Sequence, residues 1–307
     1  MNVIRSATGL QPGSKKVCLA IGFFDGVHLG HQQIIRQTIA DARQHDGLAC
    51  VLTFDQHPNT VVAPDRVPPL IYSLPQKLRA IQSLGGDAML LLRFDRAFSE
   101  QTGEVFIRQL ARDLGQIQSV CVGEDFVFGH KRSGNVALLK QLGTGLNFTV
   151  HGVAAVSLDG QVVSSTRIRE AIRAGDLDAA GQMLGRACSL AARVVKGDQL
   201  GTKLGFPTAN LDVAGLVMPP NGVYSAHAHV QGKKYRAVLN IGHRPTVQNP
   251  TSRIYVEVHL LDFNDEIYGE EMEVTFAARL RAEQKFDSVE TLKAQIEEDI
   301  RRARSLF

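Results

Sequence analysis

Hydrophobic runs alternate with amphipathic segments over the first 185 residues of the chain. The apolar runs, which we expect to be strands, are residues 17–23, 49–54, 88–94 and 119–122, and the helical patterns after them are residues 32–44, 75–84, 102–114 and 136–142. Consecutive apolar positions in the runs are typical of strands that are buried on both faces of a parallel sheet. The pattern therefore predicts a doubly wound, Rossmann-like α/β domain over residues 1–185, with ligands beyond the carboxyl ends of its strands.

The pattern changes after residue 185. Expected strands at residues 190–195, 224–230, 235–241, 254–261 and 272–280 are separated by turn sequences such as PPNG at residues 219–222. Hairpins without intervening helices predict an antiparallel β-barrel or sandwich over residues 186–307. A terminal helix is expected after a cap at Asp287 or Ser288, because Val289, Leu292 and Ile296 continue an apolar stripe toward Ala303.

Composition excludes several classes of protein. The 307 residues carry a formal net charge of +3, which is too small to indicate a sequence-independent nucleic-acid binder. No apolar run reaches the ~18 residues of a membrane helix, and residues 1–16 do not resemble a signal peptide. We expect a cytoplasmic protein without a nucleic-acid or membrane partner. Small anionic ligands stay open, and the sequence leaves open whether the protein forms a homo-oligomer.

The four cysteines lie far apart in the sequence. Cys18, Cys50, Cys121 and Cys188 form no Cys-x-x-Cys pair. Buried, reduced thiols explain them better than disulfides or a zinc site.

The run GFFDGVHLGH at residues 22–31 closes an expected strand and opens an expected helix. Its glycines permit a tight turn, and the free N–H groups at a helix start bind anions. Because His28 and His31 are three residues apart, they share a helix face and can donate hydrogen bonds to phosphate oxygens. A capped helix start with surface histidines is the alternative, whereas a zinc site would lack further ligands. Asp25 is expected to cap the turn, to orient a histidine or to help bind Mg²⁺.

A second run, SSTRIR at residues 164–169, also stands between an expected strand, residues 161–163, and an expected helix, residues 168–174. Its hydroxyl groups are either helix caps or, together with Arg167, part of a second anion site.

Together these runs resemble the nucleotidyltransferase superfamily, and most closely the adenylyltransferase module of bacterial bifunctional riboflavin kinase/FAD synthetases. FDQHP at residues 54–58 and GEDFVFG at residues 123–129 resemble two further blocks of that module, although Gln56 stands where the family usually has proline. The resemblance implies an ATP site formed by Gly22, Phe24, Asp25, Gly26, His28, His31, Ser164, Ser165, Thr166 and Arg167. It implies a flavin site formed by His57, Pro58, Asp125, Phe126 and Phe128.

The residue types suit this chemistry. An FMN phosphate must attack the α-phosphorus of ATP and expel pyrophosphate, so charge repulsion and alignment dominate the barrier. We expect His28, His31 and Arg167 to be catalytic as hydrogen-bond donors or cations, with no protein nucleophile.

The glycine-rich run GDQLGTKLGFPTAN at residues 197–210 does not match the Walker pattern of a P-loop. A barrel loop with turn glycines is the alternative to a phosphate loop. PTAN resembles the signature of riboflavin kinases, although Thr202 stands where most relatives have arginine. The resemblance implies a kinase ATP site formed by Gly201, Gly205, Pro207, Thr208 and Asn210, with Mg²⁺ bound by Thr208 and Asn210.

Residues 254–261 alternate between apolar and polar positions, which places Glu257 between Tyr255 and His259 on one strand face. An outward, solvated position is the ordinary expectation for such a glutamate. VEVHLLDF at residues 256–263 resembles the riboflavin-kinase pattern, which implies that Glu257 is the general base for the ribityl hydroxyl. RLRAEQKF at residues 279–286 resembles a block at the flavin pocket, which implies flavin contacts from Arg279, Arg281 and Glu283.

The resemblance thus predicts riboflavin phosphorylation to FMN in the C-terminal half and FMN adenylylation to FAD in the N-terminal half, with ATP as co-substrate and Mg²⁺ as cofactor. Two alternatives stay open at this point. One is a nucleotidyltransferase with another acceptor, and the other is a non-catalytic flavin-binding regulator.

Overall fold

The computed structural model describes residues 1–197, 200–246 and 249–307, and their side chains except those of residues 200, 244–246 and 249–253. The described chain divides into two compact units. The sheet unit comprises residues 1–69 and 74–165, and the barrel unit comprises residues 70–73 and 166–307. Two domains were expected with a boundary at residue 185. That boundary stays a prediction, because compactness does not test where each part folds by itself.

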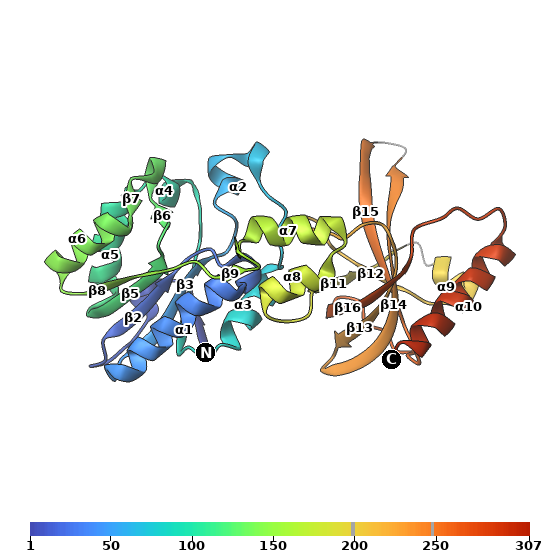
Figure 1. Ribbon diagram of the computed structural model, residues 1–307, viewed down its shortest axis with the longest axis horizontal. Helices are drawn as coiled ribbons and strands as arrows, with labels where there is room; N and C mark the ends of the chain where they lie inside the picture. Colours follow the sequence, from blue (N-terminus) through green and yellow to red (C-terminus); the bar gives the residue numbers. More distant parts are fainter. Residues whose placement is uncertain (198–199, 247–248) are drawn as a thin grey trace. The chain divides into compact units, whose positions relative to one another are not determined.

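A parallel sheet forms the centre of the sheet unit (Figure 1). Its strands are β1 (Asn2–Ile4), β2 (Val17–Ile21), β3 (Leu48–Phe54), β4 (Ala88–Leu92), β5 (Ile117–Gly123) and β8 (Thr149–Val153). Their order is β1-β4-β3-β2-β5-β8, and every pairing is parallel. The order changes direction at β2, with β3 on one side and β5 on the other. In such sheets the carboxyl ends at this change of direction form the ligand crevice.

Helices cover both faces of the sheet. On one face α1 (Leu29–Gln44) and α3 (Leu74–Gln82) pack against Cys18 and Ala20 of β2. On the other, α5 (Gly103–Leu114) and α6 (Val136–Leu146) pack against Leu19 and Ile21. Alternate residues of β2 are therefore buried on opposite faces, which explains its unbroken hydrophobic run and confirms the doubly wound fold. All four cysteines are buried and free, and burial raises the pKa of Cys50, Cys121 and Cys188 to about 12.

Shorter elements connect these layers and stand near the ends of the strands. They are η1 (Ala7–Gly9), η2 (Asp25–Val27), α2 (Asn59–Val62), η3 (Pro64–Arg66), α4 (Arg96–Ser99), β6 (Val127–Phe128), η4 (His130–Arg132), β7 (Gly134–Asn135), β9 (Ser157–Leu158) and β10 (Gln161–Val162). The expected strand at residues 161–163 is only the two-residue β10, which pairs with β9 outside the main sheet.

The barrel unit contains a closed antiparallel barrel with the strand order β11-β12-β15-β14-β13-β16. The strands are β11 (Ser189–Val195), β12 (Ala209–Leu211), β13 (Gly222–Val230), β14 (Lys233–Thr246), β15 (Asn249–Leu260) and β16 (Glu271–Arg281). Three helices precede or interrupt the barrel: α7 (Ser165–Ala174), α8 (Leu177–Leu184) and α9 (Leu200–Leu204). The barrel confirms one of the two expected architectures. The short α9 replaces the loop that the glycines suggested.

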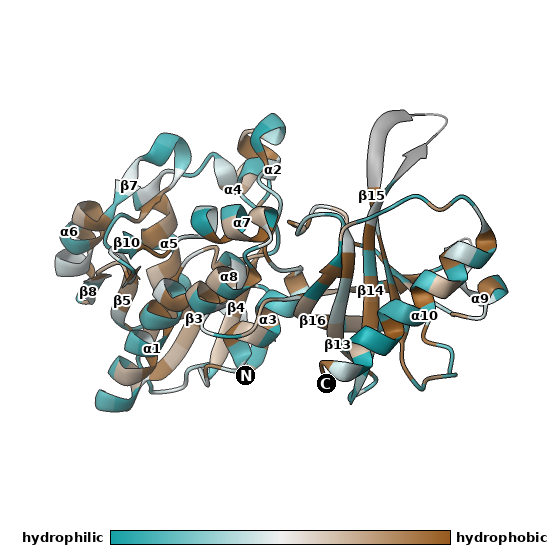
Figure 2. Cartoon of the chain, turned by 45° about the vertical axis from the view of Figure 1, so that its right-hand side comes forward, coloured by the Kyte–Doolittle hydropathy of each residue, from teal (hydrophilic) through white to brown (hydrophobic). Residues whose placement is uncertain are grey.

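The terminal helix α10 (Val289–Ser305) begins at Ser288, whose side chain accepts from the N–H of Thr291 in a capping box. Of the two expected caps, Ser288 is the one observed. Ala303 and Ile300 pack against Val223, Val238 and Leu280 of the barrel. Hydrophobic and hydrophilic positions alternate along this helix, as its amphipathic pattern predicts (Figure 2).

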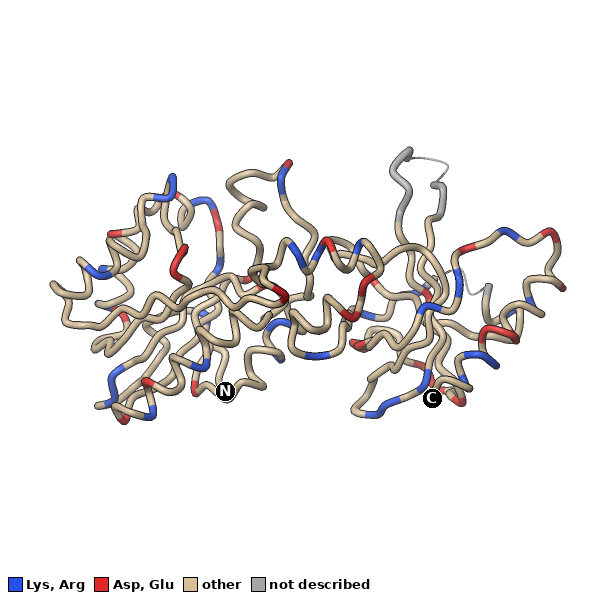
Figure 3. Tube along the Cα trace, viewed as in Figure 1, with Lys and Arg blue, Asp and Glu red and all other residues tan. Residues whose placement is uncertain are grey.

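Acidic and basic residues are interspersed along the trace of both units (Figure 3). The arginines at the end of α10 form ion pairs, since Arg304 lies 2.7 Å from Asp262 and Arg301 lies 2.7 Å from Glu298. Among the described helices, none has the length and apolar character needed to cross a bilayer.

Candidate active sites

A strained turn connects β2 to α1. Phe24 and Val27 have φ angles of 56° and 43°, in the left-handed region that few non-glycine residues adopt, and Gly26 has a φ of 72°. A Cβ atom at Gly22 would lie 2.7 Å from the Phe24 ring, so only glycine fits there. Such strain is typical of functional sites. The turn brings the chain from the strand end directly into the first residues of α1.

The two histidines stand together at the start of α1, as their spacing predicts. Their rings are stacked with centroids 3.5 Å apart, and the edge of the Phe24 ring contacts His31. His28 is the N-cap, and its Nδ1 accepts from the N–H of His31 at 3.4 Å. The neutral ring of His28 therefore carries its proton on Nε2, from which it can donate to a ligand.

Burial lowers the pKa of His31 well below its usual value, and the nearby His28 and Lys77 lower it further. The ring is therefore neutral at pH 7. Its buried Nδ1 atom has no hydrogen-bond partner among the described residues. An unsatisfied buried nitrogen is costly, and a bound polar ligand would relieve that cost.

A cavity of about 280 Å³ surrounds the histidines, and we call it the histidine pocket. The ends of β2 and β5 form it, so it lies where the strand order changes direction. Its lining includes Gly22, Phe23, Phe24, His28, Gly30, His31, Gly123, Glu124, Asp125, Phe126, Val153 and Val163. The expected flavin residue Asp125 therefore lies in this pocket.

The second expected anion site begins next to the turn. Ser165, the last residue of the sheet unit, donates through its hydroxyl to the carbonyl oxygen of Asp25 at 3.2 Å. Ser164 follows Val163 of the pocket lining. Thr166 and Arg167 continue in the first turn of α7, and their roles stay predictions.

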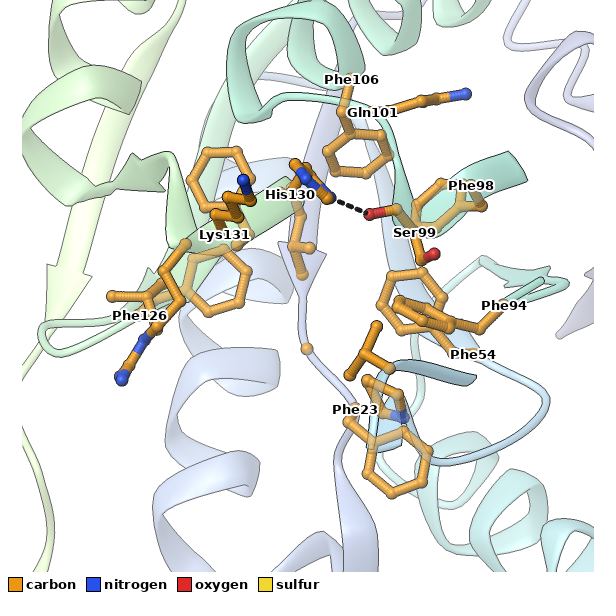
Figure 4. A pocket seen from close by; sticks show the side chains of 18 residues that line it. Phe23, Phe54, Phe94, Phe98, Ser99, Gln101, Phe106, Phe126, His130 and Lys131 are labelled. Atoms are coloured by element: carbon orange, nitrogen blue, oxygen red, sulfur yellow. Dashed lines mark hydrogen bonds between the residues drawn. The ribbon is translucent and has the colours of Figure 1, made fainter. Parts of the chain in front are cut away.

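A second cavity of the sheet unit, about 530 Å³, has phenylalanine as its most frequent lining residue, and we call it the phenylalanine pocket. Seven of the 14 phenylalanines line it: Phe23, Phe54, Phe94, Phe98, Phe106, Phe126 and Phe128. Figure 4 shows Phe126 and Lys131 on one side of this space and Phe54, Phe94 and Phe98 on the other. Ile21, Gly22, Phe23 and Phe126 line both pockets, so the two cavities adjoin.

Sequence reasoning found only part of the phenylalanine pocket. Of its residues Pro58, Phe126 and Phe128 were expected, while His57 packs against the Phe23 ring from outside the lining. The rings of residues 54, 94, 98 and 106 were not predicted as pocket residues, because in its local sequence each resembles an ordinary hydrophobic core position. Gln56, the departure from the family pattern, donates to the carbonyl oxygen of Phe94 at 2.7 Å.

In the barrel unit a row of polar side chains crosses three strands. Glu257 of β15 is in register with Asn210 of β12 on one side and Asn240 of β14 on the other. The neighbours in these strands, including Val256 and Val258, are buried in the barrel core. Because side chains alternate along a strand, the row faces outward, as the pattern predicts. Glu257 is nevertheless half-buried, because it lies in a cavity.

This cavity of about 630 Å³ lies between the outer barrel face and α10, and we call it the glutamate pocket. Its lining includes Thr208, Val223, Val238, Asn240, Tyr255, Glu257, His259, Arg281, Glu283, Phe286, Leu292 and Asp299. The expected flavin residues Arg281 and Glu283 are therefore beside the expected base. Arg279 donates to the carbonyl oxygen of Asn221 at 2.7 Å and is not among the lining residues.

Hydrogen bonds order the polar wall of the glutamate pocket. Asn240 contacts the Tyr255 hydroxyl, which donates to Glu283 at 3.3 Å, and Asn221 donates to the same carboxylate at 3.0 Å. Arg281 binds the buried carboxylate of Asp299 on α10 at 2.8 Å. Burial is the largest cause of the raised pKa of Tyr255, so this hydroxyl stays protonated and can donate. Sequence reasoning placed Tyr255 beside Glu257 on one strand face but assigned neither Asn240 nor Tyr255 to a binding site.

A smaller cavity of about 310 Å³ adjoins the glutamate pocket, with Thr208 in both linings. It is lined by Thr202, Pro207, Ala209, Leu260, Phe263, Asn264, Asp265, Glu266 and Tyr268, among others. Gly201 lines the glutamate pocket, and a Cβ atom there would be 2.5 Å from the Phe206 carbonyl oxygen. Gly205 ends the short helix with a φ of 93°. Residues 198 and 199 of the glycine-rich run and the side chains of Pro245 and Thr246 lie outside the described residues.

The side chains of Thr208 and Asn210 have oxygen atoms that suit Mg²⁺. Thr208 and Asn210 are two residues apart, so both face outward beside Glu257. Their neutral oxygens are ligands that Mg²⁺ accepts when phosphates and water complete its shell. Within the described residues no group of three or more His, Cys, Asp or Glu side chains could hold a metal ion by itself.

Comparison with known proteins shows the family of both parts of the chain. The FAD synthetase family matches residues 10–167, and the riboflavin kinase family matches residues 184–307. A solved structure from Streptococcus pneumoniae, titled as a macrolide-efflux protein, is 31% identical, covers 98% of both chains and has a TM-score of 0.82. That title describes the other protein.

Two curated relatives are bifunctional riboflavin kinase/FMN adenylyltransferases. The protein from Haemophilus influenzae is 36% identical over 100% of this chain and 99% of its own length, and the protein from Escherichia coli K12 is 36% identical over 100% and 98%. Both family matches occur in the order that the sequence predicts. The chain therefore belongs to the family of bifunctional riboflavin kinase/FMN adenylyltransferases.

Proposed function

We propose that this chain carries out the two reactions of its family at two separate sites, each built from a pair of adjoining cavities. The barrel unit transfers the γ-phosphoryl group of ATP to riboflavin, which gives FMN. The sheet unit transfers the adenylyl group of ATP to FMN, which gives FAD and pyrophosphate. The observation that carries the proposal is that in each unit a large cavity adjoins a smaller one. His28 and His31 line the smaller cavity of the sheet unit, and Thr208 lines both cavities of the barrel unit.

In the sheet unit, the apolar phenylalanine pocket suits the flat isoalloxazine ring of FMN, since aromatic rings stack on one another. The histidine pocket suits ATP. The FMN phosphate then lies at the shared wall and attacks the α-phosphorus, and pyrophosphate leaves. His28 donates from Nε2, and the free N–H groups at the start of α1 face the phosphates. Ser164, Thr166 and Arg167 hold the triphosphate in this proposal.

In the barrel unit, riboflavin occupies the glutamate pocket and ATP occupies the smaller cavity. Glu257 accepts the proton of the ribityl 5′-hydroxyl while that oxygen attacks the γ-phosphorus and ADP leaves. Thr208 and Asn210 would hold Mg²⁺ beside Glu257, and the ion would supply neutralisation of phosphate charge. The hydrogen bond between Asn240 and Tyr255 orders the wall of the glutamate pocket.

The phenylalanine pocket can be tested by replacing Phe126, whose ring stacks on Phe128 with centroids 5.2 Å apart. Phe126→Ala is expected to raise the KM for FMN in adenylylation about fivefold, since one stacking contact contributes about 1 kcal/mol. Phe148→Leu, in the core of the same unit, is the control for general loss of packing. An unchanged KM for FMN would exclude flavin binding at this wall.

The magnesium assignment can be tested at Asn210. Asn210→Ala removes one oxygen ligand, so the Mg²⁺ concentration needed for half-maximal riboflavin phosphorylation is expected to rise about tenfold, with partial rescue by excess Mg²⁺. Adenylylation of supplied FMN by the same sample is the internal control. An unchanged Mg²⁺ requirement would contradict the assignment.

The overall proposal is tested by incubating the purified chain with riboflavin, ATP and Mg²⁺ and separating riboflavin, FMN and FAD over time. FMN is expected first and FAD later. FMN without FAD would contradict the assignment of the sheet unit. Flavin binding without turnover would favour a regulator, and turnover of another phosphorylated acceptor in place of FMN would favour a different nucleotidyltransferase.

A further inference from the structure

Lys77 on α3 is a buried lysine next to the adenylylation site, and neither the motifs nor the proposed mechanism include it. Only 3% of its surface is exposed. Its ammonium group donates to the carbonyl oxygen of Phe54 at 2.8 Å and to that of Phe23 at 3.2 Å. Buried lysines are rare without such partners, because removing the charge from water is costly.

The two carbonyl groups lie where β2 and β3 end. Phe54 is the last residue of β3, and Phe23 follows β2. The backbone hydrogen bonds between these strands end with the one that the Gly22 N–H donates to the Leu52 carbonyl oxygen, at 3.1 Å. Beyond that point, the Thr53 hydroxyl and the Lys77 ammonium group both donate to the Phe23 carbonyl oxygen. Lys77 thus joins the strand ends where direct pairing has stopped.

The same ammonium group also fixes the Phe23 side chain. It lies 4.1 Å from the centroid of the Phe23 ring, within the range of a cation–π interaction. The His57 ring contacts Phe23 edge-on, with centroids 4.9 Å apart. Phe23 is therefore held through its main chain and its ring.

Phe23 lines both the phenylalanine pocket and the histidine pocket. Its place therefore sets the wall between the proposed flavin and ATP sites. Adenylyl transfer depends on the alignment of an FMN phosphate oxygen with the α-phosphorus, and small displacements of such groups lower rates strongly.

We propose that Lys77 is a positioning residue for adenylyl transfer, whose ammonium group holds Phe23 as the wall between the flavin and nucleotide pockets. The inference rests on the proposed function of the sheet unit and deepens it. Lys77 acts through Phe23 and the strand ends and does not touch the reacting atoms.

The charges around Lys77 make this role sensitive to pH. Burial lowers the pKa of Lys77 to about 8, and Asp25 and Asp55 partly oppose this shift. His31 also lies near the lysine. Burial is the largest cause of the lowered pKa of His31 and Lys77 is a further cause, so the His31 ring is neutral at pH 7. The ammonium form therefore dominates below about pH 8, and the cation–π contact weakens as pH rises through that value. We expect the rate of adenylylation to fall over the same range.

The test compares Lys77→Met, Lys77→Arg and the control Lys15→Met in the full chain. Lys15 lies on the surface of the same unit, paired with Asp46. The rates of FAD formation from FMN are measured from pH 6 to 10, with riboflavin phosphorylation as internal control. Lys77→Met is expected to lower kcat about tenfold to hundredfold and to remove the alkaline decline. Lys77→Arg, which stays charged, is expected to retain more activity and also to lose the decline near pH 8.

Unchanged kcat and an unchanged alkaline decline in Lys77→Met would overturn the inference. If that variant does not fold, the profiles of the natural chain and Lys77→Arg decide: equal declines near pH 8 overturn the inference, and loss of the decline in Lys77→Arg supports it. Failure of the proposed function is distinguishable, because then the natural chain and Lys15→Met would also form no FAD.

Discussion

Glu257→Gln is expected to lower riboflavin phosphorylation by about 10²–10⁴-fold, because a positioned general base contributes that much to proton transfer. Glutamine keeps the size of the side chain and its place between Asn210 and Asn240, so the change removes mainly the proton acceptor. The measurement is the initial rate of FMN formation from riboflavin. Riboflavin affinity is measured by flavin fluorescence and is expected to change little.

Two controls define the result. Glu297→Gln changes a glutamate on the exposed side of α10 and should leave both reactions unchanged. FAD formation from supplied FMN should also persist in Glu257→Gln, since the proposed adenylylation site lies in the other unit. Loss of both activities in a folded Glu257→Gln variant would mean that the assignment of separate sites is wrong.

The double change His28→Asn with His31→Ala is expected to reduce FAD formation by about 10²–10³-fold or more, because it removes donors that stabilise charge in the transition state. Asparagine at residue 28 keeps an oxygen that can cap α1, so loss of the helix start does not explain the result. The rate of FAD formation from FMN and ATP is measured at saturating substrates.

His45→Ala at the other end of α1 is the matched control, since His45 is exposed and caps the helix terminus. Riboflavin phosphorylation should be retained in the double variant. A double variant that forms FAD at the natural rate would refute the role of both histidines.

The periodicity of the sequence was most informative where each element has its own strong pattern. The expected strand at residues 49–54 and helix at residues 102–114 agree with β3 (Leu48–Phe54) and α5 (Gly103–Leu114) to within one residue. Elements without such a pattern were missed. β1 is only three residues long, and β8 contains Gly152 and has no fully buried residue. Their strand structure depends on pairing with neighbours in the sheet.

The candidate sites divide in the same way. The motif at residues 22–31 already predicted neighbouring histidines, because spacing along one helix fixes which side chains meet. Most of the phenylalanine pocket could not be predicted from the sequence, because its rings come from separate segments between residues 23 and 128. Lys77 looked like an ordinary polar position of an amphipathic helix.

The sequence by itself determined the alternation of strands and helices, the change to hairpins after residue 185 and the motifs that identify the family, because these depend on neighbours along the chain. Only the tertiary structure decided that Glu257 lies in a cavity under α10, that two pockets adjoin at Phe23 and that Lys77 is buried between two strand ends. Such features depend on which distant segments pack together, and neither local spacing nor composition encodes that packing directly.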